Sequence, residues 1–413
     1  MAEPGVRFKQ DDGSSFPKWK EYTISDLFSK IGAKNINGKN TNVITNSAEF
    51  GLIPQRDFFD KDIAVEGRTD NYTVIQTGDF VYNPRKSSYA PMGPFNCYRL
   101  EEDGIVSPLY SCLRPKGILN PDYLLWYFQT DKWYGYVNDH GAQNGARHDR
   151  VGMTDSILMG IPVTAPCEEE QQKIADFLSS VDKVIAASEQ EVANLETQKK
   201  AVMKRIFSQE VRFKRDDGTD FPEWKVKTIG DVTDSLTGYS FESELFTEKG
   251  IRLLRGMNIK RGELDFSEDI CKYWPTSEGL DKFLLQENDL IVQMDGALVG
   301  KSFGLVKADH LPALLVQRVT RLRGDLTIIQ LLYQILSMGK FDKDMKLNQT
   351  STAVPHISLK DITGYRICIP SALEEQHLIA DFLSDFDEAI AAAKKEMELW
   401  KELKKGLLQQ MFV

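Results

Sequence analysis

Apolar side chains recur in alternating steps of four and three residues along two long stretches of this chain, residues 174–206 and 379–411. Glu, Lys and Gln are frequent at the flanking positions. This is the pattern of a coiled-coil seam, and it predicts helices over about 168–208 and 373–412, each roughly 60 Å long at 1.5 Å per residue. The alternative is an amphipathic helix that lies on the core of its own domain, but such helices usually end well before about 25 residues.

Lysines occupy two corresponding positions of this seam, Lys199 and Lys404. A long side chain of this kind can extend past an apolar seam to water, and we favour this interpretation. The alternative is that these lysines set the register of the two helices or contact a partner.

The chain contains one unit twice. Residues 6–31 return as 211–236 and residues 169–179 return as 374–384, with an offset of 205 in both cases (211 − 6 and 374 − 169). Because the spacing is held across a long intervening stretch, the whole unit was duplicated. The intervening sequences share little, which suggests two modules on one scaffold that do the same kind of work on two different targets.

The repeat also predicts the architecture. Two copies of a module followed by a helix are most simply related by a pseudo-twofold axis, which makes the helices antiparallel. The chain termini should be neighbours, because Val413 corresponds to Ser208, which lies just before Val211. We therefore predict an α+β protein with two globular α/β domains at opposite ends of an antiparallel two-helix coiled coil. The predicted boundaries are 1–167 for the first domain, 168–208 for the central helix, 209–372 for the second domain and 373–413 for the C-terminal helix.

The composition is that of a soluble globular protein, with 413 residues, 27% charged and 41% hydrophobic. No apolar run approaches the roughly 18 residues that span a bilayer, and the start does not resemble a signal peptide, so we expect a cytoplasmic protein without a membrane partner. The five cysteines show no metal-ligand or redox spacing and should be reduced thiols. The net charge of −10 argues against simple wrapping of nucleic acid, so DNA contact must use local basic patches or a basic partner.

The start of each predicted helix carries the same polar residues. Carboxylates there favour the positive end of the helix dipole, but this does not explain why the glutamines are also kept. Contact with a partner protein is one interpretation, and incomplete drift after a recent duplication is the other. The residues concerned are Glu170, Gln171, Glu375 and Gln376.

Three kinds of polar loop are candidates for contact with nucleic acid: a loop after a strand-like run (74–83 and 285–293), a loop shortly before each long helix, and a basic run at 252–261. Arg and Lys reach phosphates or guanine edges, whereas Asn and Gln pair with adenine edges. In each case the alternative is a loop that is merely solvated or connecting. The residues selected are Arg85, Lys86, Gln143, Asn144, Arg147, Arg150, Arg255, Asn258, Lys260, Lys301, Asn348, Gln349 and Thr350.

Motifs for catalysis are not found. The sequence has no GxxxxGK[ST] phosphate loop, and its histidines and cysteines do not cluster at zinc-ligand spacing. Asn83-Pro84-Arg85 comes nearest to the Asn-Pro-Pro-aromatic loop of adenine methyltransferases, but it lacks the second proline and the aromatic residue. The aromatic runs at 123–128 and 133–136 are interpreted as helix core rather than as base-stacking platforms.

These motifs resemble those of one known family. Two variable modules, each with an "FPEWK" and "TIGDV" type beginning (221–225 and 228–232, matched by 16–20 and 23–27) and an "EEQ…IADFLS" segment that opens a long helix, are similar to the specificity subunit of type I restriction-modification systems. The resemblance implies a subunit without catalysis or a cofactor of its own, whose two target-recognition domains read the two parts of a split double-stranded DNA sequence. It also implies that the helices set the spacing and dock two methyltransferase subunits, which use S-adenosylmethionine. Restriction subunits that translocate DNA would bring ATP and Mg²⁺.

Two other classes of protein stay open on the residues alone. A single-chain adenine-N6 DNA methyltransferase with its own recognition domain would bind S-adenosylmethionine, and the missing methyltransferase loop argues against it. A coiled-coil adaptor without affinity for DNA would use its modules to bind proteins. Adjacent genes for a methyltransferase and a large helicase-nuclease would separate these classes.

Overall fold

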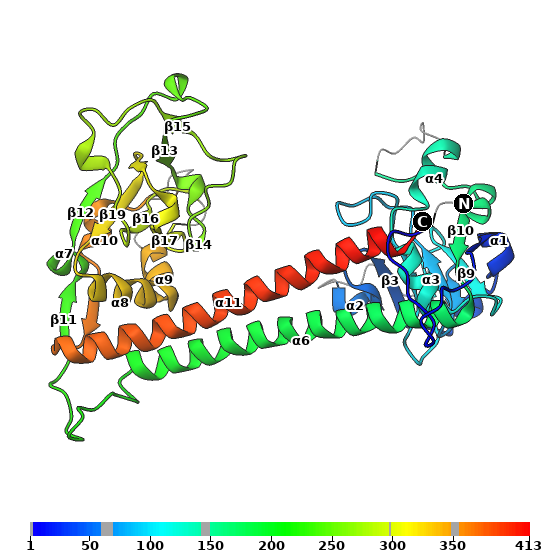
Figure 1. Cartoon of the computed structure of the whole chain (residues 1–413). Coiled ribbons are helices and arrows are strands. Elements are labelled where there is room, and N and C mark those ends of the chain that lie inside the picture. Colours follow the sequence, from blue (N-terminus) through cyan, green and yellow to red (C-terminus); the bar gives the residue numbers. More distant parts are fainter. Residues whose placement is uncertain (1–2, 59–68, 142–148, 297–298, 348–354) are drawn as a thin grey trace. The chain divides into compact units, whose positions relative to one another are not determined.

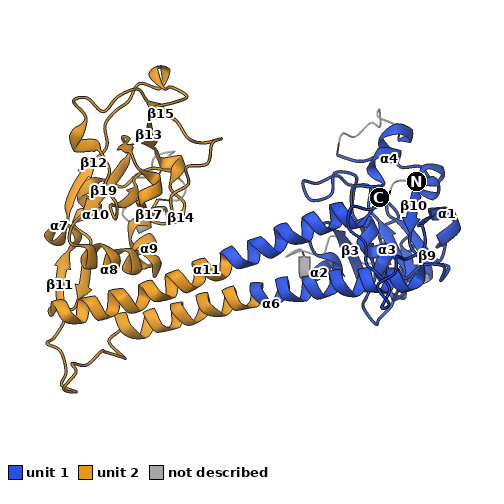
Figure 2. Cartoon of the chain, in the orientation of Figure 1, with its two compact units in different colours: residues 1–189, 395–413 blue, residues 190–394 orange. Residues whose placement is uncertain are grey.

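The computed structural model divides the chain into two compact units (Figure 2). Unit 1 consists of residues 1–189 and 395–413, and unit 2 of residues 190–394. Each unit therefore contains one module and a stretch of each long helix; the predicted four-part division stays a prediction. The structure describes residues 3–58, 69–141, 149–296, 299–347 and 355–413.

The two predicted long helices are confirmed as α6 (Glu168–Phe207) and α11 (Leu373–Met411) (Figure 1). Apolar seam residues such as Leu178 in unit 1 and Leu383 in unit 2 are fully buried, as the heptad pattern requires. Acidic residues occupy the first turn of both helices, where the helix dipole favours negative charge.

The seam lysines link the two helices within each unit, and their partners show that the helices run antiparallel there. In unit 2, Lys199 Nζ lies 2.5 Å from Asp387 Oδ1; in unit 1, Lys404 Nζ lies 2.6 Å from Asp182 Oδ1. Lys199 is only 9% exposed. The favoured interpretation that the seam lysines extend to water is therefore wrong for Lys199. Its ion pair with Asp387 is geometrically demanding and so constrains how the two helices align.

Each module contains two sheets and a separate strand pair. In unit 1 the sheets have the orders β2-β9-β6-β7 and β4-β3-β8-β5, and β1 pairs with β10. The strands are β1 (Lys20–Thr23), β2 (Phe28–Lys30), β3 (Val43–Ser47), β4 (Gly51–Pro54), β5 (Thr73–Ile75), β6 (Phe80–Tyr82), β7 (Phe95–Cys97), β8 (Gly104–Val106), β9 (Ser111–Pro115) and β10 (Pro162–Ala165).

Unit 2 has sheets of order β12-β19-β16-β17-β14 and β15-β13-β18, and a pair of β11 with β20. The strands are β11 (Lys225–Thr228), β12 (Asp234–Thr237), β13 (Ile251–Leu254), β14 (Arg261–Gly262), β15 (Tyr273–Trp274), β16 (Leu290–Gln293), β17 (Phe303–Leu305), β18 (Ala313–Leu315), β19 (Val319–Arg323) and β20 (Arg366–Ile369).

The two modules share a topology even where their sequences have diverged. The orders β2-β9-β6-β7 and β12-β19-β16-β17 match strand for strand, and all neighbouring pairs are antiparallel. The predicted equivalence of 74–83 with 285–293 is thereby confirmed, since β6 and β16 occupy the same place. Both strands are central and almost wholly buried, which explains their continuous apolar sequences.

A buried carboxylate precedes each of these central strands. Asp79 receives Arg114 Nε and Nη2, both at 2.8 Å, and Asp289 receives Arg323 Nε at 2.6 Å and Nη2 at 2.7 Å. Both aspartates are nearly inaccessible, so the two-point arginine contact compensates the buried charge. We call each of these two-point arginine–carboxylate contacts a fork. One fork joins β6 to β9 and the other joins β16 to β19, in each case at the end of the strand opposite the candidate loop.

Helices pack against the sheet that contains β6 in unit 1 and against the sheet that contains β16 in unit 2. In unit 1 the predicted aromatic runs form core: Tyr123, Tyr127 and Phe128 on α3, and Trp133 before α4, are buried. Asn120 caps α3 by accepting from the N–H groups of Asp122 and Tyr123. The module helices are α1 (Ile24–Leu27), α2 (Gln55–Phe58), α3 (Pro121–Phe128), α4 (Tyr134–His140) and α5 (Asp155–Gly160) in unit 1, and α7 (Ile229–Val232), α8 (Leu326–Ser337), α9 (Lys340–Leu347) and α10 (Leu359–Thr363) in unit 2.

The repeated leading segment of each unit is locked to the start of a long helix by an arginine fork. In unit 1, Arg7 Nε and Nη2 donate to Glu170 at 3.1 and 2.7 Å; in unit 2, Arg212 donates to Glu375 at 3.0 and 2.8 Å. Both carboxylates are fully buried. The same two arginines also donate to carbonyls of the segment itself, at Pro17 and Pro222.

The glutamines beside these carboxylates are also internal. Gln171 donates to the carbonyl of Pro166 at 2.8 Å and accepts from Asn120 N at 2.8 Å, and Gln376 donates to the carbonyl of Pro370 at 2.7 Å. The burial of Glu170, Gln171, Glu375 and Gln376 argues against contact with a partner, and drift after duplication stays an open alternative. Their hydrogen bonds hold each unit together, which is a structural reason to keep them.

The chain termini meet in unit 1, as predicted. Val6 N donates to Gln410 O at 3.1 Å (Figure 1). In unit 2 the corresponding bond joins Val211 N to Arg205 O at 3.2 Å, where the chain is continuous. The two chain termini in unit 1 thus make the same backbone contact that the continuous chain makes at residues 205–211 in unit 2.

Candidate nucleic-acid interface

A short antiparallel bridge joins two of the candidate loops in unit 1. Lys86 N donates to Asp149 O at 2.9 Å and Val151 N donates to Pro84 O at 2.8 Å, so Arg85 and Arg150 lie directly opposite each other. Because the hydrogen bonds flank this pair rather than join it, the two side chains lie on one face and close together. The sequence proposed both arginines separately, and the fold brings them together.

The same bridge recurs in unit 2 with different side chains. Gly296 N donates to Pro355 O at 3.0 Å and Ile357 N donates to Met294 O at 2.9 Å, which places Asp295 opposite His356. The bridge follows β16 as the first follows β6. The common backbone is therefore an element of the duplicated scaffold, and its side chains vary.

The two bridges differ in charge balance. In unit 2, Asp295 bonds to His356 Nδ1 and lies 3.1 Å from Arg318 Nη1. In unit 1, no carboxylate among the described residues forms an ion pair with Arg85 or Arg150. Arg85 is exposed and Arg150 is partly exposed. Like charges opposite each other on a ladder are unfavourable, so this pair of arginines is suited to an anionic ligand.

A buried amide network holds the bridge of unit 1 in place. Asn83 donates to Asn46 O at 3.1 Å and accepts from Arg85 N at 3.0 Å. Asn46 in turn donates to Val81 O at 2.7 Å and accepts from Asn96 at 2.7 Å. The Asn83 amide is thus engaged in positioning the loop and does not point outward as an amine-holding methyltransferase residue would.

Arg318 is a functional candidate that the sequence analysis missed. Its side chain is well exposed, its backbone has a φ of +68°, and its carbonyl accepts from Met294 N at 3.0 Å. A non-glycine residue in this conformation is strained, and such strain gathers at functional sites. Its position in a turn between β18 and β19 gave no periodic signal in the sequence.

Lys301 lies at a cavity of about 340 Å³ with Arg261, Tyr333 and Asp342 among its lining residues. Its Nζ is 3.7 Å from Asp342 Oδ2, and the side chain is partly exposed. Lys301 stays a candidate, and Arg261 joins it as a neighbouring cation that the sequence did not single out.

Two residues of the basic run at 252–261 are corrected by the structure. Asn258 is fully buried, where it accepts from Arg255 N at 3.0 Å and donates to Asp265 O at 2.9 Å. Arg255 is half-buried and its Nη2 donates to the carbonyl of Ile270, while burial lowers the pKa of its guanidinium. The Asn258 side chain stabilises this turn, because a short amide satisfies buried backbone groups well, and the Arg255 side chain is engaged with a backbone carbonyl.

The remaining candidates for contact with nucleic acid are either exposed or lie outside the residues that the structure describes. Lys86 is exposed, and Lys260 is partly exposed with its Nζ 3.6 Å from Asp265 Oδ2. The others lie outside the residues that the structure describes: Gln143, Asn144, Arg147, Asn348, Gln349 and Thr350.

Known proteins resemble this chain in sequence. Residues 222–399 match the family described as the type I restriction modification DNA specificity domain. The MjaVIII type I restriction enzyme specificity subunit of Methanocaldococcus jannaschii is 25% identical over 97% of this chain and 94% of its own length. The EcoAI specificity subunit of Escherichia coli is 26% identical over 46% of this chain and 32% of its own length.

A solved structure resembles it in fold. The crystal structure of the type I restriction-modification system S subunit from M. genitalium matches with a TM-score of 0.59 at 13% identity, over 100% of this chain and 99% of that chain. The chain thus contains two modules with matching strand orders and different side chains on the equivalent bridges. In sequence the chain is therefore similar to type I restriction-modification specificity subunits, over residues 222–399 for the family model and over 97% of its length for the MjaVIII subunit. Within the part of the chain that the structure describes, no helix is long and apolar enough to cross a bilayer.

Proposed function

We propose that this chain gives a type I restriction-modification complex its DNA sequence specificity, with each module reading one half of a bipartite site. The observation that carries this proposal is the pair Arg85 and Arg150, held side by side on a scaffold bridge without a carboxylate partner among the described residues. Guanidinium forks bind guanine edges and phosphates with two parallel hydrogen bonds. The equivalent bridge of unit 2 carries Asp295, His356 and Arg318, which supports different targets for the two modules.

The chain is proposed to act without catalysis of its own, in the cytoplasm. Two methyltransferase subunits that bind S-adenosylmethionine, and restriction subunits that use ATP and Mg²⁺, would supply the chemistry. The modules are proposed to lie at opposite ends of the paired helices, which set the distance between the half-sites and dock the methyltransferases. The acidic balance of the chain, a net charge of −10, supports a division of labour in which partners supply part of the affinity for DNA.

Alanine substitution of the bridge arginines tests the proposal. In the complex with methyltransferase subunits, Arg85→Ala and Arg150→Ala should each weaken binding to the cognate duplex by about 1–3 kcal/mol if the side chain meets a base edge. If it meets only phosphate, the loss should be even across sequences and the slope of log affinity against log salt should fall by about 1. Fluorescence anisotropy against single-base variants of each half-site measures both.

Arg85→Lys is the matched control, because it keeps the charge and removes the fork. It should bind DNA like the parent if Arg85 meets a phosphate, and like Arg85→Ala if Arg85 meets a base edge. Variants with parental affinity for every duplex would contradict the proposed interface. An isolated chain that binds its target as tightly as the complex does would contradict the division of labour.

A further inference from the structure

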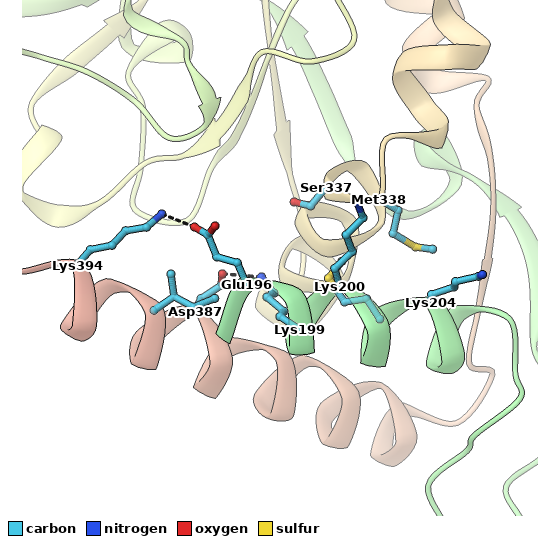
Figure 3. A pocket seen from close by; sticks show the side chains of 10 residues that line it. Glu196, Lys199, Lys200, Lys204, Ser337, Met338, Asp387 and Lys394 are labelled. Atoms are coloured by element: carbon cyan, nitrogen blue, oxygen red, sulfur yellow. Dashed lines mark hydrogen bonds and ion pairs between the residues drawn. The ribbon is translucent and has the colours of Figure 1, made fainter. Parts of the chain in front are cut away.

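Two ion pairs join the long helices at equivalent places with their charges exchanged. In unit 2, Lys394 Nζ on α11 lies 2.6 Å from Glu196 Oε1 on α6 (Figure 3). In unit 1, Lys401 Nζ on α11 lies 2.9 Å from Glu189 Oε1 on α6, and this carboxylate raises the pKa of Lys401. At the offset of 205 residues, Glu196 corresponds to Lys401 and Lys394 to Glu189. The contact is kept in both repeats, with both acids on α6 and both lysines on α11.

The lysine-aspartate pairs of the same helices follow a different rule. Lys199 with Asp387 and Lys404 with Asp182 also occupy equivalent places, but the residue type is the same in both repeats. Each helix therefore carries one lysine and one aspartate of this kind. These pairs would form equally well between α6 and α11 or between two copies of one helix.

The glutamate-lysine pairs and the lysine-aspartate pairs would behave differently if a helix paired with a second copy of itself. If α6 of one chain lay against α6 of another in the same antiparallel register, Glu189 would face Glu196 twice. Two copies of α11 would likewise place Lys394 against Lys401 twice. The lysine-aspartate pairs would still form in this arrangement, whereas the glutamate-lysine pairs would be replaced by repulsive contacts between like charges.

We propose that these two glutamate-lysine pairs make α6 accept α11 and reject a second copy of α6, so that two chains do not exchange helices into α6–α6 and α11–α11 pairs. Exposed ion pairs contribute little to stability, whereas like charges at the flanks of a coiled coil direct partner choice. Both pairs are about half-exposed, as partner-selecting charges usually are. One consequence rests on the proposed function: each molecule keeps one copy of each module and reads an asymmetric site.

Charge exchange in the full-length chain tests this inference. The double variants Glu196→Lys/Lys394→Glu and Glu189→Lys/Lys401→Glu keep every pair within the chain attractive, but they make each helix complementary to itself. The quadruple variant that combines them makes α6 wholly basic and α11 wholly acidic at these positions, which restores rejection. All three keep the net charge of −10, so general charge effects are controlled.

The measurement is the fraction of dimer, by sedimentation velocity, after each full-length protein is refolded from urea at the same high concentration. The double variants should form at least about tenfold more helix-exchanged dimer than the parent, and the quadruple variant should match the parent. Thermal unfolding of the double-variant monomers should match that of the parent. The inference is overturned if the double variants dimerise no more than the parent, if the quadruple variant dimerises as they do, or if the double-variant monomers melt far lower. DNA binding is not measured, so failure here is distinct from failure of the proposed function.

Discussion

Replacement of Arg212 by methionine should strongly destabilise unit 2. The carboxylate of Glu375 is fully buried and receives Arg212 at 3.0 and 2.8 Å and Trp224 Nε1 at 3.2 Å. Loss of the arginine leaves a buried charge with only the indole as donor, which costs about 3–5 kcal/mol. For a unit of this size that corresponds to a fall in melting temperature on the order of 10 °C.

The repeat supplies a matched comparison. Arg7 and Glu170 form the same fork in unit 1, but Trp19 Nε1 has no hydrogen-bond partner among the residues that the structure describes. Glu170 would thus lose every side-chain donor in Arg7→Met, and that variant should be the less stable of the two by about 1 kcal/mol. Adding Glu375→Gln to Arg212→Met should recover part of the loss, because the buried group is then neutral.

Urea unfolding of the isolated chain, followed by tryptophan fluorescence and far-ultraviolet circular dichroism, measures these differences. The test depends on whether Arg212→Met lowers the stability of the chain or its association with partner subunits. If Arg212→Met left the urea midpoint unchanged and impaired only association with methyltransferase subunits, the fork would be a partner contact after all. The internal role assigned to both forks would then be refuted.

Other outcomes follow from the same structure. Asp289→Asn and Asp79→Asn should each lower the stability of their own unit by about 3 kcal/mol, since each breaks a buried fork, and equal midpoints with the parent in urea would contradict this. A circular permutant with Val413 joined to Pro4 and opened after Gln209 should fold with near-parental circular dichroism, because the termini already reproduce the internal connection; an unfolded permutant would disprove that equivalence. One heptad inserted into both α6 and α11 should lengthen the accepted spacer by about three base pairs, from roughly 10 Å of added helix, without altering either half-sequence. Methylation-site sequencing that showed changed bases and an unchanged gap would contradict the helices as a ruler.

The long helices, the repeat and the equivalence of β6 with β16 could be predicted because they rest on periodicity and on an internal alignment. The forks could have been found in the same way. Arg7 and Glu170 are both retained at the offset of 205, and two opposite charges kept together indicate a contact. The retained carboxylates were instead interpreted as charges at the positive end of the helix dipole and as contacts for a partner.

The interface could be predicted only in part. Arg85 and Arg150 were each proposed from local composition, but their pairing depends on a bridge between distant segments that has no periodic signal. Asn258 was misassigned because an amide that suits an adenine edge also suits a buried turn, and only burial separates the two cases. Base identity depends in addition on loop geometry and DNA shape, which side-chain type does not specify.

Exchange of one module tests the central claim most directly. Residues 32–160 would be replaced by the corresponding stretch of a relative, the chain would be assembled with the proposed methyltransferase subunits, and the methylated sites would be sequenced. We predict that one half of the bipartite sequence changes while the other half and the spacer stay the same. A change in both halves, or in neither, would contradict independent reading by the two modules.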